Sequence, residues 1–546
     1  MAKQNSQFPP SPTSRLNIHT SARMRRDNTT TILELPDELL DQILAELKWG
    51  TATPAFDALQ FFETFTENTA DIQRVRLTCR RFASRASPLL VPVASVSISD
   101  PPSLERLEQI AGHTLFAPYV KAVHVSFGFY EPELVADIRL LAAHLVHIWR
   151  GTGRLAQTLD DLDSFCYEEI EANSEKEGMR LLRREHAEYQ RRYEAQQNLG
   201  LSSAAERIAK AMARMPKATR LILSDTPPCS AAAAAPADGG WLLRPTSWAT
   251  AFKLNRGSPP IDILFGLPAA VHKAGVMLTG LRIHRLRLPA HLPLWSPRPE
   301  DWESIYNDPP PPEVGDLRAA CCSLRILEFT PDYEPNCWPT ASPTHLAWPG
   351  MTASYMMVCR PIGQLLGWIL TASSRLTHVS VDLQLVHGSF PYELAMPASP
   401  LSWPCIRGLR LQDGTLEART LTNFLSATTD TLTALDLEGM LLCASAVGDW
   451  PFTTPPHSWA VVLNQLRDHA RSSVCRSIRL RRPRGAEFED SSVSETDMAH
   501  LRSLFEPDDV GLSAVDRFIG GITDRNPLVE AGKTPFLYPR PRHQGT

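Results

Sequence analysis

Apolar residues recur at helical spacing near the start of the chain. The segment Ile32–Leu47 carries apolar residues at positions 39, 40, 43, 44 and 47, which together form one face of a helix. Pro36 suits the first turn of this helix, and Asp37 and Glu38 place negative charge at its amino end. The pattern therefore predicts a helix that begins near Pro36.

A second helix is predicted from about Asp71 to Ser87, where Pro88 stops it. Its apolar face is formed by Ile72, Val75, Leu77, Cys79, Phe82 and Ala83. An apolar run over residues 89–98 follows and ends in strand-like alternation. Further along, the spacing predicts a helix over Glu131–Trp149, and the charged segment 155–199, which lacks proline, predicts a helix or helical hairpin.

A short pattern, apolar-x-x-apolar-x-apolar, recurs through most of the remaining chain. Its final pair alternates as in a strand with one buried face. Several copies follow a helical segment, at 204–215, 363–374, 421–427 and 459–471. The copies are Val120/Val123/Val125, Ala218/Leu221/Leu223, Ile283/Leu286/Leu288, Leu324/Leu327/Phe329, Leu376/Val379/Val381, Ile406/Leu409/Leu411, Leu432/Leu435/Leu437 and Cys475/Ile478/Leu480.

Helix, turn and strand in repeated succession are similar to an irregular leucine-rich-repeat solenoid, which implies a parallel sheet. The intervals between copies are 98, 65, 41, 52, 30, 26 and 43 residues, whereas regular repeats of this family recur about every 20–29 residues. Long insertions therefore separate the copies. An open solenoid and a compact α/β domain both remain compatible with the pattern.

Proline is concentrated in those insertions. The chain has 46 prolines; none lies in residues 133–215, and 34 follow Asp225. The segments Pro289–Asp316 and Pro331–Pro349 are rich in proline, and Ser230–Gly240 is an alanine-rich linker. Loops of this kind often emerge from the binding face of a solenoid, so we expect either recognition loops or simple disordered insertions.

Charge and composition narrow the classes of function. With 55 basic and 60 acidic residues, the formal net charge is −5, which predicts no general attraction to nucleic acid or to an anionic membrane surface. No apolar run approaches the roughly 18–20 residues of a membrane span, and residues 1–28 lack the apolar core of a secretory signal. We expect an intracellular protein, cytoplasmic or nuclear or both, with free thiols.

The sequence lacks the common catalytic motifs: the G-x-S-x-G elbow, the P-loop, G-x-G-x-x-G and H-E-x-x-H. Its cysteines and histidines do not cluster at metal-ligand spacing; His144 and His147, three residues apart on one predicted helix face, have no third ligand nearby. The expectation is a protein that is not an enzyme, with no catalytic residues, no metal and no cofactor. Because catalytic groups also assemble from distant positions, an unrecognised enzyme stays as an alternative.

The blocks Leu35–Leu40, Leu77–Phe82 and Ser87–Leu90 together resemble an F-box of the fungal type, over roughly residues 31–98. The sequence departs from that pattern in the longer stretch between Leu47 and Asp71. The resemblance implies a three-helix module that binds the Skp-type adaptor of a cullin–RING ubiquitin ligase. The adaptor-binding residues that it implies are Leu35, Pro36, Leu39, Leu40, Ile43, Leu44, Leu47, Val75, Cys79 and Phe82.

The hypothesis that follows is a substrate-recognition subunit of an SCF-type ubiquitin ligase, in which the repeat region holds an unknown target protein. Two alternatives remain: a repeat-based scaffold without a ligase role, and an ordinary amphipathic helix packed in the core of the protein itself. The predicted fold class is α/β, with an N-terminal helical F-box module before an irregular leucine-rich-repeat-like solenoid with long Pro-rich insertions. The predicted regions are a disordered tail (1–28), the module (29–98), a first strand with long charged helices (99–216), the repeat domain (217–490) and a partly disordered extension (491–546).

Overall fold

The computed structural model describes residues 32–49, 69–142, 175–224, 263–284, 312–330, 365–382, 403–443, 458–488, 495–508 and 511–531. The predicted tail 1–28, the alanine-rich linker and the segment Pro331–Pro349 lie outside the described residues, as do most of Pro289–Asp316 and the His144–His147 pair. The description below concerns the parts of the chain within those ranges.

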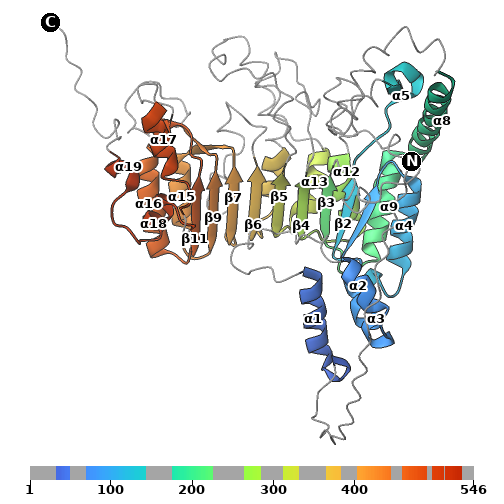
Figure 1. The fold of residues 1–546 in the computed structure, drawn as a ribbon, viewed down its shortest axis with the longest axis horizontal. Helices are drawn as coiled ribbons and strands as arrows, with labels where there is room; N and C mark the ends of the chain where they lie inside the picture. The colour runs from blue at the N-terminus through green and yellow to red at the C-terminus, as the bar shows by residue number, and fades with distance from the viewer. Residues whose placement is uncertain are drawn as a thin grey trace, which may run out of the picture.

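The protein is a mixed α/β structure built on a nine-stranded parallel sheet (Figure 1). Each strand lies beside the strand that precedes it in the sheet along the chain, so the order β1-β2-β3-β4-β5-β6-β7-β9-β11 follows the sequence. The strands are β1 (Val93–Ser97), β2 (Ala122–Ser126), β3 (Arg220–Ser224), β4 (Gly280–His284), β5 (Ile326–Thr330), β6 (His378–Asp382), β7 (Gly408–Gln412), β9 (Ala434–Glu438) and β11 (Ser477–Arg481). Two short parallel strands, β8 (Thr415–Glu417) and β10 (Leu441–Cys443), form a second sheet.

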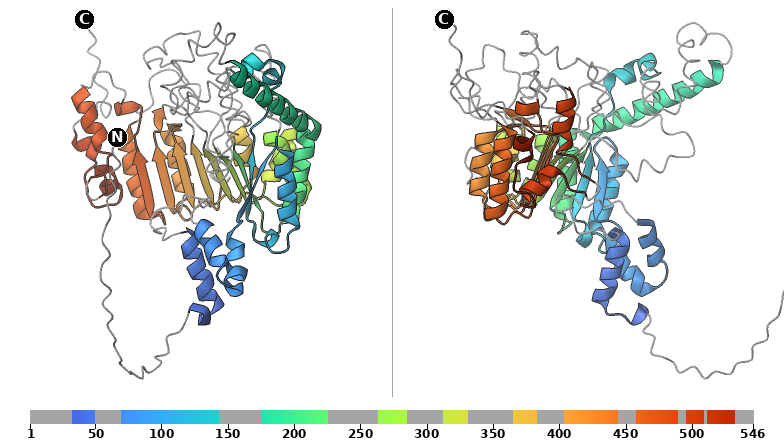
Figure 2. Two further views of the ribbon diagram at one scale, coloured as in Figure 1. Left: turned by 45° about the vertical axis from the view of Figure 1, so that its right-hand side comes forward. Right: turned by 60° about the vertical axis from the view of Figure 1, so that its left-hand side comes forward.

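Helices connect successive strands and pack against one another along the sheet (Figure 2). Their apolar residues and those of one sheet face form a single core cluster that runs from Ala94 to Leu528. The helices are α4 (Pro101–Gly112), α9 (Leu201–Ala213), α12 (Ile263–Lys273), α13 (Pro312–Cys321), a helix over residues 365–372, α15 (Ala418–Ala427) and α16 (Trp459–Ser472).

The two faces of the sheet differ in polarity because side chains alternate along each strand. The core face carries pairs such as Leu221 and Leu223, or Leu435 and Leu437, all buried. On the opposite face, residues paired in register form a row of mostly polar side chains across neighbouring strands: Ser95, His124, Ile222, Arg282, Glu328, Ser380, Arg410, Asp436 and Arg479. Arg282 and Glu328 form an ion pair of 2.9 Å within this row.

Seven of the eight predicted strand patterns coincide with strands of the sheet. Of the third copy, Ile283/Leu286/Leu288, the last two residues lie outside the described ranges, and β4 (Gly280–His284) follows the pattern Leu278/Leu281/Ile283 instead. Ile283 fits both patterns, and the turn before the strand decides between them: Gly275 has a φ of 84°, and the Val276 N–H donates to the Val271 carbonyl. β1 carries a further copy of the pattern, Val91/Ala94/Val96, which is not among the predicted ones.

Predicted helices were found at α9, residues 365–372, α15 and α16, whereas α4, α12 and α13 were not foreseen. The single helix expected over Glu131–Trp149 is wrong in its first part: α5 (Pro132–Ala136) ends, and another helix begins at residue 138. Between them Asp137 is extended, with φ −134° and ψ 111°, and its Oδ1 accepts from the Arg139 N–H. The charged segment contains α8 (Glu175–Leu199), while residues 155–174 lie outside the described ranges.

Within the described residues after β11 lie a short 3-10 helix (Ala486–Phe488) and the α-helices α17 (Glu495–Ser503), α18 (Ala514–Ile519) and α19 (Pro527–Glu530). Phe518 and Leu528 are buried in the same core as the sheet, and α18 contacts β11. Covering the last strand in this way limits pairing of its free edge with another chain. The nine-stranded sheet thus extends from β1, inside the predicted segment 29–98, to a helical cover inside the predicted extension.

Candidate functional site

The N-terminal helices form a small unit below the sheet, joined to it through β1 (Figures 1 and 2). Helix α1 (Asp37–Trp49) begins near Pro36, as predicted: the Pro36 carbonyl accepts the Leu40 N–H at 3.1 Å, so Pro36 directly precedes the first helical residue. Helices α2 (Thr69–Arg76) and α3 (Arg80–Ala86) pack against α1 and against each other. We call residues 32–49 and 69–90 the helical module.

The single second helix expected over Asp71–Ser87 is wrong, because the chain turns between α2 and α3. The Leu77 and Thr78 N–H groups donate to carbonyls of the preceding helical turn, at 3.0 and 3.1 Å. Cys79 then adopts an extended conformation as the N-cap of α3, and its Sγ accepts the Phe82 N–H at 3.4 Å. The apolar pattern does not reveal this break, because Ile72 and Val75 of α2 and Phe82 and Ala86 of α3 all pack in one core and stand at helical spacing in the sequence.

The core of the module consists of Leu40, Leu44, Ile72 and Ala86, each at most 2% exposed. Partly buried side chains pack around these four, among them the predicted site residues Leu47, Val75 and Phe82. Leu40 and Leu44 therefore face inward and hold the helices of the module together. Much of the apolar stripe that the sequence displays on α1 is thus used within the module itself.

Leu39 and Ile43 lie on the other flank of the stripe, where they are 46% and 42% exposed. Their spacing of four residues places them one turn apart on α1, side by side on its surface. Pro36 is also exposed, and Leu35 is half-buried. Two further apolar residues of the module, Ile32 and Leu77, are exposed and were not among the predicted site residues.

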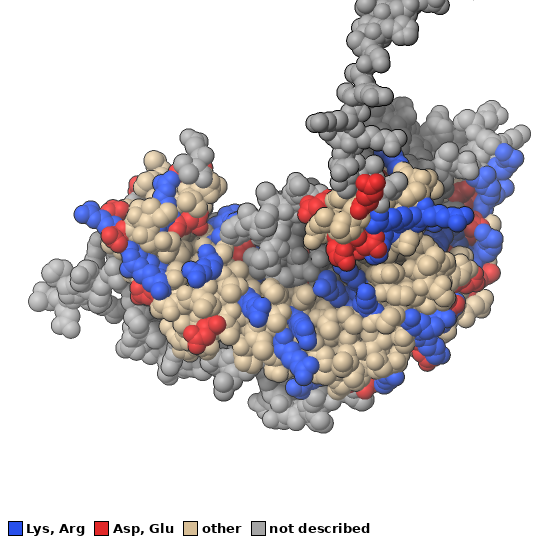
Figure 3. Space-filling model, turned by 90° about the horizontal axis from the view of Figure 1, so that it is seen from below, with Lys and Arg blue, Asp and Glu red and all other residues tan. Residues whose placement is uncertain are grey.

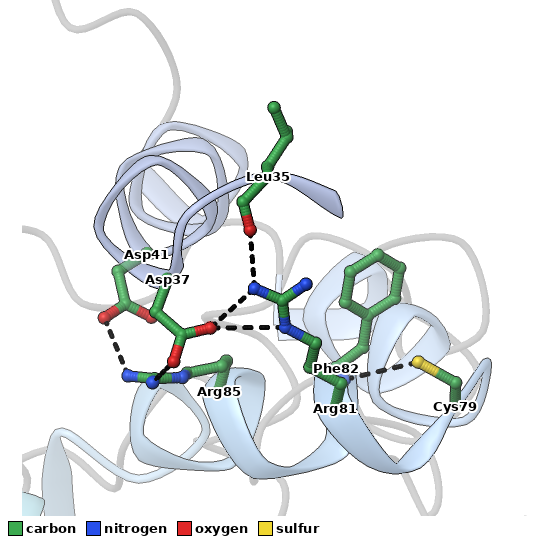
Figure 4. Close-up of polar contacts among 7 residues, drawn as sticks. All are labelled: Leu35, Asp37, Asp41, Cys79, Arg81, Phe82 and Arg85. Atoms are coloured by element: carbon green, nitrogen blue, oxygen red, sulfur yellow. Dashed lines mark hydrogen bonds and ion pairs between the residues drawn. The ribbon is translucent and has the colours of Figure 1, made fainter. Parts of the chain in front are cut away.

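Two arginines of α3 bind two aspartates at the start of α1 (Figure 4). Arg81 donates to the Leu35 carbonyl at 2.5 Å and to Asp37 Oδ1 at 2.7 Å. Arg85 pairs with Asp37 Oδ2, and its Nη1 lies 3.3 Å from Asp41 Oδ2. These contacts fix the amino end of α1 against α3, so the direction in which Leu39 and Ile43 face is set by the fold.

The ion pairs between α1 and α3 were not predicted, although the spacing of their residues in the sequence indicates them. Asp37 and Asp41 are four residues apart, and so are Arg81 and Arg85, so each pair occupies one face of its helix. Complementary pairs at equal spacing on two helices that share a core predict a contact between them. Taken alone, Asp37 indicates only a favourable interaction with the helix dipole.

Groups with strongly shifted acidity lie away from the module. Burial raises the pKa of the Cys321 thiol to about 12 and that of Cys475 to about 11, so both stay protonated and are poor nucleophiles at neutral pH. Burial also raises the pKa of Glu328 and of Asp436 on the polar sheet face, although neighbouring arginines oppose this shift. Among the described residues, no three His, Cys, Asp or Glu side chains are grouped so as to hold a metal ion.

Comparison with protein families and with curated proteins yields no match to any part of the chain. Within the described ranges, no helix combines the length and the apolar content needed to cross a membrane. The functional argument therefore rests on the residues of the chain and on their arrangement.

Proposed function

We propose that the protein is a substrate-recognition subunit of a cullin–RING ubiquitin ligase of the SCF type. The helical module binds a Skp-type adaptor, and the sheet region, a leucine-rich-repeat-like array with long insertions, holds a target protein. The observation that carries the proposal is the exposed Leu39–Ile43 pair on α1, next to a module core that needs neither residue. Catalysis of ubiquitin transfer belongs to other subunits, and this chain contributes proximity.

Three features of the module support adaptor binding. The pair lies on a helix whose orientation is fixed by the Arg81 and Arg85 contacts, which reduces the entropy lost on association. The block Leu35–Leu40 and the α3 segment that follows Cys79 carry the F-box resemblance. The module also projects below the sheet as a separate small unit, with its own core.

Burial of Leu39 and Ile43 alone does not supply enough free energy for adaptor binding. Leu39 and Ile43 are already more than half buried, so covering the rest contributes about 1.5–3 kcal/mol in total, roughly half of the value for two fully exposed side chains. Association itself costs about 4–15 kcal/mol. An adaptor must therefore also contact neighbouring exposed groups, for which Pro36, Ile32 and Leu77 are the available apolar residues of the module.

The array interpretation of the sheet rests on its regularity. Neighbouring strands from β1 to β11 are parallel and follow chain order, which is how stacked repeats are connected. Asp413, Gly439 and Arg482, which directly follow β7, β9 and β11, all adopt positive φ, at 49°, 62° and 46°. A backbone turn repeated at equivalent positions favours a repeating unit over an irregular compact domain.

The test is binding of a purified Skp-type adaptor to the full chain, measured by co-purification and by calorimetry. Leu39→Glu together with Ile43→Glu abolishes binding if the proposal holds, and the thermal midpoint stays unchanged because both side chains are exposed. Leu44 is unsuited to this test because a charge there disrupts the module core. The matched control, Leu512→Glu with Ile522→Glu, changes two exposed apolar residues of the C-terminal cover and leaves binding intact.

A second candidate, a protein-binding scaffold without a ligase role, is favoured by one observation. Leu40 and Leu44 already lie in the core of the module, so less apolar surface is available to a partner than the sequence suggests. If the folded wild-type chain does not bind the adaptor, the ligase assignment is wrong and the scaffold is the better description.

A further inference from the structure

Positive charge is concentrated where the chain enters the strands of the sheet. We call this region the strand-entry edge; it comprises the turns before β2 to β11, residues 113–121, 214–220, 274–280, 322–326, 373–378, 403–408, 428–434 and 473–477. These turns contain eight Lys or Arg residues and one acidic residue, Asp430, although the whole chain has a net charge of −5. The basic residues are Lys121, Arg214, Lys217, Arg220, Arg325, Arg375, Arg407 and Arg476.

The backbone of this edge is held by a hydrogen-bond pattern that repeats from strand to strand. The Arg325 carbonyl accepts the N–H groups of Thr377 and His378, at 2.8 and 3.0 Å. The Arg407 carbonyl accepts those of Thr433 and Ala434, at 2.8 and 2.9 Å. The hydroxyls of Thr377 and Thr433 donate to the same two carbonyls, each at 2.9 Å. The arginine side chains therefore project from a fixed backbone.

Threonine and arginine alternate at the position directly before the strands in this half of the edge. Arg325 precedes β5, Thr377 β6, Arg407 β7, Thr433 β9 and Arg476 β11. Since neighbouring strands are about 4.7–4.9 Å apart, successive arginines stand roughly 9–10 Å apart, which limits their mutual repulsion. Figure 3 looks onto this side from below, and Lys and Arg side chains follow one another along it with few acidic groups between them.

These arginines are available to a partner. Arg325, Arg375, Arg407 and Arg476 are exposed, and none of them forms an ion pair with another residue of the described ranges. Helix dipoles do not account for them, because the favourable effect of a cation is confined to the last helical turn. Arg325 and Arg476 come four residues after α13 and α16 end, at the start of a strand.

We propose that the strand-entry edge binds an acidic polypeptide segment, whose carboxylates pair with Arg325, Arg407 and Arg476. Guanidinium groups bind carboxylates through two parallel hydrogen bonds, which gives such a row geometric as well as electrostatic preference. The residues that this binding uses are distinct from the exposed apolar residues of the helical module.

A polypeptide fits the edge better than a nucleic acid. Unspecific binding of single strands uses aromatic side chains on which bases stack. Within the turns of the strand-entry edge, Tyr119 is the one exposed aromatic residue, and Lys217 covers its ring, with Nζ 5.3 Å from the centroid. The overall charge of −5 also repels a long polyanion, whereas a short acidic segment meets only the local basic row.

The test uses the full chain and a labelled poly-glutamate peptide, with binding followed by fluorescence anisotropy. Charge reversal at Arg325, Arg407 and Arg476 to Glu weakens binding by at least about tenfold, and added salt weakens wild-type binding. The control variant reverses three exposed arginines elsewhere, Arg106, Arg183 and Arg502, which changes the net charge equally. It retains most of the wild-type affinity.

Three results overturn the proposal. They are absence of peptide binding by the wild-type chain, equal weakening in the two triple variants, and tighter binding of a labelled oligothymidylate through the same three arginines. The triple Arg→Lys variant keeps the charge but loses the paired hydrogen bonds, so it binds more weakly than the wild type and more tightly than the charge-reversed variant. If the charge-reversed chain has a lowered thermal midpoint, the triple Arg→Gln variant replaces it, with the same expected loss.

Discussion

The helical module and the sheet region bury their apolar residues in different ways. The module encloses four fully buried side chains and leaves Leu39 and Ile43 on its surface. In the sheet region, helices, strands and the C-terminal cover all take part in one large core cluster. Its polar sheet face and its basic strand-entry edge lie outside that core.

This difference separates the two regions by the kind of surface that each presents. The module offers an apolar pair on a helix, while the strand-entry edge offers arginines on fixed turns. The two regions also differ in what holds them together. In the module, side-chain contacts of Arg81 and Arg85 join α1 and α3. In the sheet, backbone hydrogen bonds join each strand to its neighbours. Single substitutions should therefore affect the two regions unequally.

The largest expected effect comes from Leu44→Ala in the module core. Removing a buried leucine side chain destabilises a protein by about 2–5 kcal/mol. Because the module has only four fully buried residues, we expect this change to unfold α1–α3 and leave the sheet folded. Hydrogen exchange resolved by segment measures this as lost protection in 37–49 and 69–86, with unchanged protection in the strands.

Leu409→Ala is the matched control, because Leu409 is equally buried but lies in the large core of the sheet. The sheet core loses a similar free energy of folding but keeps many other buried contacts, so β7 keeps its protection from hydrogen exchange at low denaturant. The comparison of the two regions is wrong if Leu44→Ala lowers protection throughout the chain, since the module and the sheet would then unfold as one unit.

A smaller effect, located in the sheet and not in the module, is expected when the pH is lowered. His124 in β2 lies on the polar sheet face; burial lowers its pKa from 6.5 to about 4, and the nearby Arg282 adds to this shift. Its Nε2 is buried without a hydrogen-bond partner among the described residues. Between these pH values the unfolded chain binds a proton that the folded chain does not, so folding stability falls as the pH drops from 6.5 toward 4.

His124→Gln removes this contribution, which is on the order of 2 kcal/mol. Urea unfolding of the wild type and the variant at neutral and mildly acidic pH measures it: the variant loses less stability on acidification. The module provides the contrast, because His124 lies in the sheet, so protection of α1–α3 should show no such difference between the two proteins. Equal acid sensitivity of the wild type and the variant contradicts the assignment.

The strands were largely predictable because each buries two alternating residues of a repeated pattern, and burial enforces that alternation. β4 was the exception, since Ile283 belongs to two overlapping patterns and only the turn at Gly275 separates them. In the module, the sequence indicated which residues of α1 are apolar, but not which of them are buried in the core and which are exposed. Leu40 and Leu44 face the core and Leu39 and Ile43 face outward because α2 and α3 pack on one flank of the stripe. That choice depends on contacts between helices that are separated in the sequence by residues 50–68.

The smallest effects are expected from removing one side-chain hydrogen bond in each region. Arg81→Lys keeps the charge but loses the fork that reaches both the Leu35 carbonyl and Asp37, and because these groups are partly exposed we expect a loss of about 1 kcal/mol. Thr377→Val removes the hydroxyl donor to the Arg325 carbonyl, which still accepts two backbone N–H groups, so the loss should be about 0.5 kcal/mol or less. Segment-resolved hydrogen exchange measures both losses, in α1 and in β6. A larger loss for Thr377→Val than for Arg81→Lys would show that side chains, and not the backbone ladder, hold the strand-entry turns.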